Sequence, residues 1–185
     1  MLITPLEILY FIILVAVVGF IFMGLFVRRP KTVYDMMHPK KFDFRDFKFA
    51  ALVAAPGIVL HELAHKFVAM GFGYSATFTI WPIGLIIGII LKLIGSPFIL
   101  LAPGYVQIPM ITDAVIYRLI AFAGPAVNLI LWIVSIIVLK NVVNMSRKQV
   151  AFWSLTKTIN MILFFFNMIP FGPLDGAKVL FGPQF

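Results

Sequence analysis

An ionisable pentapeptide inside a long apolar run constrains this chain more than any other sequence feature. His61-Glu62-Leu63-Ala64-His65 falls within the apolar run from Ala50 to Met70. That run is long enough for a helix that crosses a bilayer, which needs about 20 residues. On such a helix, the two histidines lie one turn apart and point the same way. Because ionisable groups at membrane depth are costly, three of them together call for a functional explanation.

The residue types in this pentapeptide predict a metal site. Two imidazoles on one helix face, with a carboxylate after the first, form the HExxH arrangement. In that arrangement both histidines bind Zn²⁺ and the glutamate is a general base. His61 and His65 are therefore predicted zinc ligands, and Glu62 is the predicted base of a zinc protease. A tetrahedral site still lacks one protein ligand and one water. The chain has no cysteine, so only histidine and carboxylate can hold the zinc.

The composition indicates a polytopic membrane protein. Hydrophobic residues make up 62% of the 185 positions and charged residues only 12%, whereas about a quarter of the residues in a soluble domain are charged. The N-terminal run lacks a basic segment and a small-residue cleavage site, so we expect it to remain as a transmembrane helix. We predict an all-α fold with about four transmembrane helices: Leu6–Val27, Ala50–Met70, Ala114–Leu139 and Val150–Ile169.

The segments between these runs predict shorter elements. Residues 28–49 form a charged connector, expected to contain short extended or interfacial pieces. Polar and apolar residues alternate over Ala76–Trp81, which predicts a short membrane-embedded strand. The stretch 83–95 is too short to span, so a short re-entrant or interfacial helix is favoured over a tilted span from Ile80 to Leu101. Residues 98–109 are expected to be extended chain.

Two further expectations concern the C-terminal half. Proline removes a backbone hydrogen bond, so Gly124-Pro125 should kink its helix or end the first half of it. A short amphipathic helix is predicted over Asp175–Phe181. We divide the chain into residues 1–49, the first transmembrane helix and the charged connector, and residues 50–185, the metalloprotease core.

Elimination favours Asp175 as the third zinc ligand. The other carboxylates lie at the start of the first span, in the charged connector or just before a span. Asp175 follows a helix broken by Pro170 and Pro173, and it precedes Gly176, which lets another backbone approach closely. The alternative for an aspartate before a helical turn is an N-cap. Two other polar residues of the spans receive ordinary roles: Lys66 is expected to extend to the membrane surface, and Asn160 to be structural.

A second motif resembles that of a known family. Asn167-Met168-Ile169-Pro170-Phe171-Gly172-Pro173-Leu174-Asp175-Gly176 fits the pattern Asn-x-x-Pro-x-x-x-Leu-Asp-Gly, which the site-2 protease family of intramembrane zinc metalloproteases combines with HExxH. Gly124-Pro125-Ala126-Val127-Asn128 resembles the Gly-Pro element of that family, and Trp81-Pro82-Ile83-Gly84 resembles the turn after its membrane-embedded strand. The resemblance covers about residues 50 to 180.

The resemblance implies a site and an activity. His61, His65 and Asp175 would bind one zinc ion, and Glu62 would be the base. Asn167 and Asn128 would face the substrate or support the site, with Asn167 the candidate oxyanion donor. The implied reaction is hydrolysis of peptide bonds in or near transmembrane segments of membrane-protein substrates. An extended substrate at membrane depth must satisfy its backbone, so we expect it to pair with the edge of Ala76–Trp81.

Two other functions fit parts of the pattern. A non-catalytic zinc-binding membrane scaffold of the same fold would need only the three ligands, so the intact Glu62 argues against it. A zinc transporter would need several polar sites across the bilayer, and the sequence has one cluster. The net charge of +8 comes from basic residues between the hydrophobic runs. This placement favours contact with anionic lipid and excludes nucleic acid as a partner.

The charge pattern and the resemblance give opposite membrane orientations. The connectors at 28–48 and 140–148 are both rich in Lys and Arg, which would place them in the cytoplasm. The resemblance implies instead that the zinc, at the far side of those helices, is nearer the cytosol. Both alternatives stay open. We expect a multi-pass protein in the plasma membrane of a prokaryote.

Overall fold

The computed structural model describes residues 2–26, 42–96 and 104–183. Four helices in these ranges are long and apolar enough to cross a membrane: α1 (Pro5–Phe22), α3 (Phe44–Gly71), α5 (Ala114–Asn141) and α6 (Arg147–Asn167). Two helices are short: α4 (Pro82–Leu93) and α7 (Asp175–Phe181). Large apolar side chains such as Ile12, Ile130 and Phe165 are exposed on the long helices, as a lipid-facing surface requires. The predicted fold with four long apolar helices, a short strand region and a short C-terminal helix is confirmed, and the strand region is a small two-stranded sheet.

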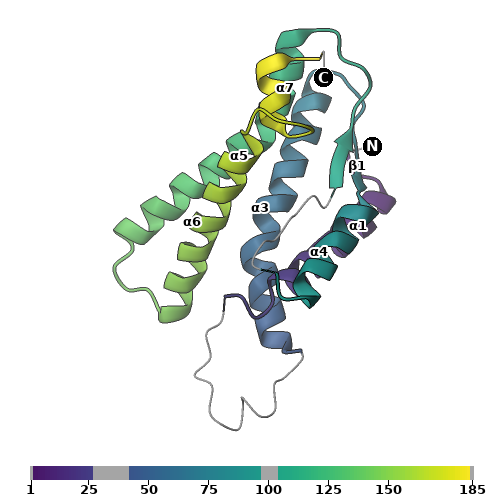
Figure 1. The fold of residues 1–185 in the computed structure, drawn as a ribbon. Helices are drawn as coiled ribbons and strands as arrows, with labels where there is room; N and C mark the ends of the chain where they lie inside the picture. The colour runs from purple at the N-terminus through teal and green to yellow at the C-terminus, as the bar shows by residue number, and fades with distance from the viewer. Residues whose placement is uncertain (1, 27–41, 97–103, 184–185) are drawn as a thin grey trace.

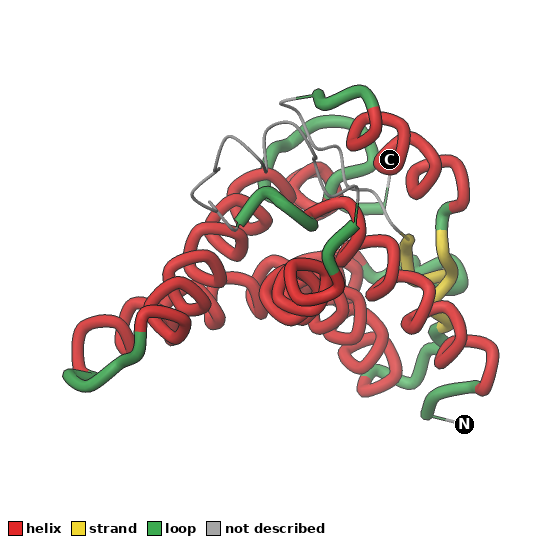
Figure 2. Tube along the Cα trace, turned by 90° about the horizontal axis from the view of Figure 1, so that it is seen from below, coloured by secondary structure: helices red, strands yellow, loops and turns green. Residues whose placement is uncertain are grey.

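Helix α3 lies at the centre of the molecule (Figure 1). It packs against α1 on one side and against α5 and α6 on the other, and the view along its axis shows the same arrangement (Figure 2). Helices α5 and α6 form an antiparallel pair, and α7 packs on α5. The buried core between α1 and α3 includes Leu14, Val18 and Val53. The buried face of α3, which includes His61 and His65, is therefore enclosed by other parts of the chain.

Polar caps determine where several helices begin. Thr4 and Glu7 form a capping box at the start of α1, where each side chain hydrogen-bonds the backbone N–H of the other residue. Ser146 and Gln149 form another at the start of α6. Such boxes satisfy backbone N–H groups that have no partner inside the helix. Helix α6 therefore begins at Arg147, before the predicted start at Val150, and it ends at Asn167 instead of Ile169.

The start of α3 corrects one expectation. Residues Phe44–Phe49 were expected to be extended or interfacial pieces, but they form the first turns of α3. The Asp43 side chain accepts hydrogen bonds from the backbone N–H groups of Arg45 and Asp46, so it caps the helix here. The Phe47 ring packs beside Gly19 of α1. The Asp43 cap and the contact of Phe47 with α1 therefore favour a helix here, although the alternation of apolar and charged residues predicted extended chain.

The predicted strand is present and has a partner. Strand β1 (Thr77–Ile80) pairs in an antiparallel manner with β2 (Gly104–Gln107), and Phe78 lies opposite Val106. The sequence predicted β1 within Ala76–Trp81 and extended chain around β2, but not their pairing. A Cβ atom at Gly104 would lie 2.6 Å from the Thr79 carbonyl oxygen, so this close approach requires glycine.

The remaining elements bear on two expectations. The short helix predicted within 83–95 is α4 (Pro82–Leu93), and its end at Leu93 excludes a helical span from Ile80 to Leu101. Helix α5 does not end at Pro125 but continues through it to Asn141. Helix α1 ends at Phe22, before the predicted end of the first span at Val27, because the chain turns at residues 23–26. Val27 itself, residues 28–41 of the connector and residues 98–103 lie outside the described residues.

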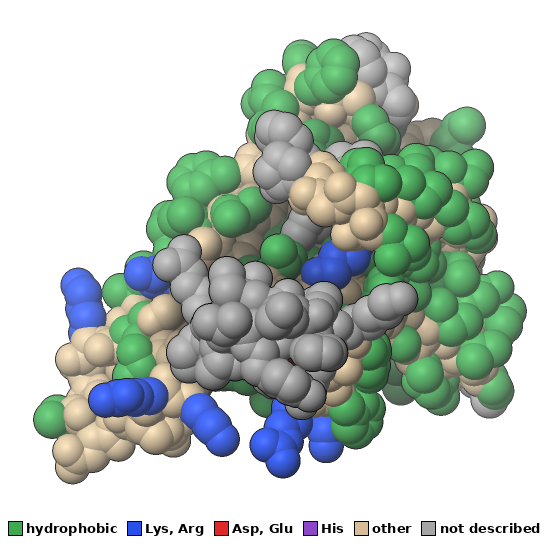
Figure 3. Space-filling model, turned by 60° about the horizontal axis from the view of Figure 1, so that its bottom comes forward, with side chains coloured by type: hydrophobic (Ala, Val, Ile, Leu, Met, Phe, Trp, Pro, Cys, Tyr) green, Lys and Arg blue, Asp and Glu red, His purple; other side chains and the backbone are tan. Residues whose placement is uncertain are grey.

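Basic side chains gather at one end of the bundle (Figure 3). This end contains the start of α3 and the turn between α5 and α6. The exposed basic residues of these segments are Arg45, Lys48, Lys140, Arg147 and Lys148. Helix α7 lies at the opposite end of α5 and α6 (Figure 1).

Candidate metal centre

Three predicted ligands from two distant parts of the chain meet at one point. His61 and His65 lie one turn apart on α3, and Asp175 begins α7. The Asp175 Oδ2 atom is 3.1 Å from the Nε2 atom of each histidine, and the two Nε2 atoms are also 3.1 Å apart. All three side chains are buried. The result is an equilateral triangle of potential ligand atoms.

Close backbone packing holds Asp175 at this position. Gly176 lies against the end of α6, where a Cβ atom would overlap the carbonyl group of Met168. The turn between α6 and α7 contains Gly172 with a positive φ of 59°, a conformation that favours glycine. These two glycines explain why the Pro-Gly-rich segment can bring the aspartate back onto α3.

The other ring nitrogens fix the tautomers of the two histidines. His61 Nδ1 is 2.7 Å from Asn128 Oδ1, and His65 Nδ1 is 2.7 Å from the Ile120 carbonyl oxygen. A carbonyl oxygen only accepts, so His65 Nδ1 donates. Asn128 uses its Nδ2 group to donate to Gly57 O and Asn160 Oδ1, which assigns Oδ1 as the acceptor from His61. In the neutral form of each histidine, Nε2 is therefore the nitrogen with a free lone pair for a metal.

In that form, the lone pairs of the two Nε2 atoms and of one Asp175 oxygen converge on one point. A metal cation at this point would bind all three of these atoms. Tetrahedral zinc with bonds of about 2.0–2.1 Å separates its ligands by roughly 3.3 Å. The observed donor set and its 3.1 Å edges fit zinc.

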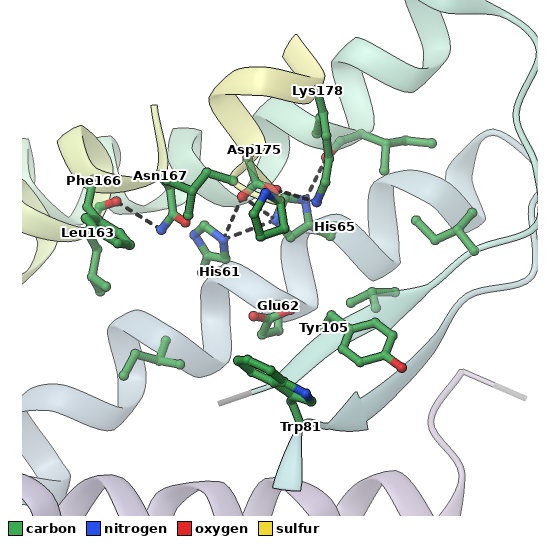
Figure 4. A pocket seen from close by; sticks show the side chains of 18 of the residues that line it. His61, Glu62, His65, Trp81, Tyr105, Leu163, Phe166, Asn167, Asp175 and Lys178 are labelled. Atoms are coloured by element: carbon green, nitrogen blue, oxygen red, sulfur yellow. Dashed lines mark hydrogen bonds and ion pairs between the residues drawn. The ribbon is translucent and has the colours of Figure 1, made fainter. Parts of the chain in front are cut away.

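Glu62 lies beside this triangle and is not part of it. The predicted base is buried and lines a cavity of about 730 Å³ that also contains the three ligands. Figure 4 shows Glu62 between His61 and the aromatic side chains of Trp81 and Tyr105. A carboxylate in this place can exchange a proton with a molecule in the cavity while the ligands remain engaged.

The two predicted asparagines occupy different places. Asn167 lines the cavity, and its Nδ2 donates one hydrogen bond to Leu163 O at 3.0 Å (Figure 4). That amide has a second hydrogen for a ligand in the cavity. Asn128 is completely buried behind His61 and is not among the described residues that line the cavity. It supports the site by orienting His61, and Asn160 in turn holds Asn128, a connection that the sequence did not reveal.

Lys66 does not extend to the membrane surface as expected. Its Nζ is buried and donates to Glu7 Oε1 of α1 at 2.5 Å and to the Ala76 carbonyl oxygen at 2.7 Å. The same Glu7 oxygen accepts from the Phe78 N–H at 2.7 Å. This ion pair ties α1 and β1 to the helix that carries the histidines. In the sequence, Glu7 stands out only as an acidic residue near the start of an apolar helix. That position does not indicate that Lys66 is its partner.

Gly124 explains the Gly-Pro element of α5. A methyl group at this position would lie 2.6 Å from His61 Nε2 and would overlap His65 Nε2. We expect Gly124→Ala to displace both histidines and to lower zinc affinity by at least about tenfold, the size of effect seen when groups around a metal are disturbed. Competition with a chromophoric chelator measures this affinity.

Gly71→Ala is the matched control for this substitution. A Cβ atom there would have no neighbour within 4 Å, so zinc affinity should not change. An unchanged zinc affinity in Gly124→Ala would contradict a metal site formed by the two Nε2 atoms that face Gly124.

The combination of site and fold defines a class: a membrane-embedded protein with a metalloprotease-type metal site. A sequence comparison then gives the family. The chain is 36% identical, over 139 residues, to a protein of Methanocaldococcus jannaschii named "Putative zinc metalloprotease". The matched region covers 72% of this chain and 70% of the archaeal protein. The chain therefore belongs to the family of this zinc metalloprotease. No family model and no solved structure matches the chain.

Proposed function

We propose that this chain is an intramembrane zinc metalloprotease of the site-2 type, which hydrolyses peptide bonds in or near transmembrane segments of membrane-protein substrates. One observation carries the proposal: three ligand atoms converge on a helix that can cross a bilayer. His61 is 17 residues from the start of α3 and ten from its end. At 1.5 Å per residue, it lies about 26 Å and 15 Å from the two ends.

Each polar residue of the site has a separate role in the proposed peptide hydrolysis. A zinc ion held by His61, His65 and Asp175 would lower the pKa of a water molecule toward ~7 and polarise a peptide carbonyl. Glu62 accepts the proton of the attacking water and then delivers it to the leaving amine. The free hydrogen of the Asn167 amide donates to the oxygen that becomes negative. Asn128 and the Ile120 carbonyl keep the histidine rings oriented throughout.

We propose that the substrate enters as an extended strand and pairs with β2, not with the edge of Ala76–Trp81 expected from the sequence. One edge of β1 pairs with β2. On the other edge, Ala76 O and Phe78 N–H already bond to Lys66 and Glu7. Backbone groups of alternate residues leave opposite edges of a strand, so Val106, opposite Phe78, directs its N–H and C=O away from β1. Val106 lines the cavity, so we assign the receiving edge to β2 instead of β1.

Replacing Val106 by proline tests this edge. Proline removes an N–H that β1 does not use, so zinc content should be unchanged while the cleavage rate falls about tenfold, the effect of one lost hydrogen bond of about 1.5 kcal/mol. Val106→Ala keeps the N–H and should cleave within about twofold of wild type. Equal rates in the two variants would show that the β2 edge does not bind substrate.

The basic end of the bundle is the proposed contact with lipid. Arg45, Lys48 and Lys148 are exposed there, and anionic headgroups attract such residues. We propose that this end lies at the headgroup level. The substrate of the site would then be a protein that shares the bilayer.

Cleavage of a single-span membrane protein tests the proposed function. Wild-type protein in liposomes should cut this substrate inside or beside its apolar segment, and mass spectrometry of the products locates the cut. An unfolded soluble protein such as casein should remain intact. If only the soluble protein is cut, the chain is a protease but not an intramembrane one. If neither is cut while zinc is bound, the non-catalytic zinc-binding scaffold is the better account.

A further inference from the structure

The carboxylate of Asp175 is divided between two kinds of partner. Its Oδ2 atom faces the two histidine Nε2 atoms, while its Oδ1 atom accepts a hydrogen bond from Lys178 Nζ at 3.0 Å (Figure 4). Lys178 lies one turn further along α7 and lines the same cavity. Neither sequence motif singled out this lysine.

We propose that Lys178 is a positioning residue that keeps Asp175 a ligand through one oxygen, so that water would be the fourth ligand of a four-coordinate site. The inference rests on the proposed metal site. Catalytic zinc sites have three protein ligands and a water in the fourth position. Carboxylates can bind a metal through one oxygen or through both. If Asp175 turned both oxygens to the metal, water would become a fifth ligand, and the site would lose the four-coordinate geometry of a catalytic zinc site.

An ordinary surface ion pair does not account for this arrangement. Exposed lysine–aspartate pairs contribute little to stability. In such a pair both side chains are exposed to solvent. Here the Asp175 side chain is only 8% exposed, whereas that of Lys178 is 38% exposed. Among the described residues that line the cavity, Lys178 is the only Lys or Arg. Its ammonium therefore satisfies an oxygen that would otherwise be buried next to the metal.

Cobalt substitution distinguishes this role from simple stabilisation. Co²⁺ in a four-coordinate site absorbs visible light more strongly than in a five-coordinate site, so the spectrum reports the geometry of the ligands. Wild type and Lys178→Arg, which retains a donor, should both give the intense four-coordinate spectrum. Lys178→Met and Lys178→Gln should bind Co²⁺ but give the weaker five-coordinate spectrum. Their zinc forms should cleave substrate about 10- to 100-fold more slowly, as expected for loss of a group that orients a ligand.

Arg118→Met is the matched control. Arg118 is a cation near the same helix, but it donates to the Leu180 carbonyl oxygen and not to Asp175. Its spectrum and cleavage rate should equal those of wild type. A four-coordinate spectrum in Lys178→Met and Lys178→Gln would overturn the inference while leaving the proposed protease intact. If wild type itself binds neither Co²⁺ nor Zn²⁺, the proposed metal site fails as well.

Discussion

Replacing Glu62 by glutamine is expected to abolish peptide hydrolysis while one zinc ion per chain stays bound. Glu62 is not one of the three converging ligands, and it lines the cavity beside them. Glutamine has nearly the same shape but cannot accept the proton of water. General bases contribute about 10²- to 10⁴-fold to rates, so the cleavage rate should fall by at least about a hundredfold. Cleavage assays and metal analysis of the same preparation measure both quantities.

Glu62→Asp is the informative control for that experiment. It retains a carboxylate but withdraws it by one methylene group, so its activity should lie between those of wild type and Glu62→Gln. A Glu62→Gln protein that cleaves at more than a tenth of the wild-type rate would exclude Glu62 as the base. Loss of zinc in the same variant would indicate that Glu62 binds the metal, which would contradict the ligand set of His61, His65 and Asp175.

Replacing Lys66 by methionine is expected to destabilise the folded protein strongly. The substitution leaves the Glu7 carboxylate buried without the cation that it contacts at 2.5 Å. Breaking a buried ion pair on one side costs about 3–5 kcal/mol of unfolding free energy. Unfolding titrations in mixed detergent micelles measure the change.

The double variant Glu7→Gln/Lys66→Met separates loss of the pair from loss of packing. It removes both charges, so part of the stability should return relative to Lys66→Met alone, with a coupling of about 0.5–3 kcal/mol. Lys148→Met, an exposed lysine at the basic end, should change stability by less than about 0.5 kcal/mol. Identical unfolding curves for Lys66→Met and wild type would show that the pair does not hold α1 and β1 on α3.

Local patterns predicted most of the fold and the ligands. The length of the apolar runs gave the four long helices because membrane thickness sets a minimum length. His61 and His65 are four residues apart on one helix, so their common face follows from helix geometry alone. Asp175 was found because few acidic residues follow an apolar helix. These features need no knowledge of which helices pack together.

Features that depend on tertiary contacts could not be predicted in the same way. Glu7 and Lys66 are 59 positions apart, and nothing in either segment indicates the other. The chain from His61 through Asn128 to Asn160 crosses three helices. Asn160 was therefore expected to be only structural, and Asn128 was assigned to the site through the family resemblance alone. The pairing of β1 with β2 was missed because register between distant strands depends on the packed structure.

The most direct test of the central claim is a zinc titration of the metal-free protein against cleavage of a single-span substrate. The site formed by His61, His65 and Asp175 predicts no cleavage without metal and a linear rise that stops at one zinc per chain. Asp175→Asn should bind zinc more weakly and need an excess of zinc for any activity. Full cleavage by the metal-free protein, or a rise that continues well beyond one equivalent, would contradict a zinc protease that acts through this site.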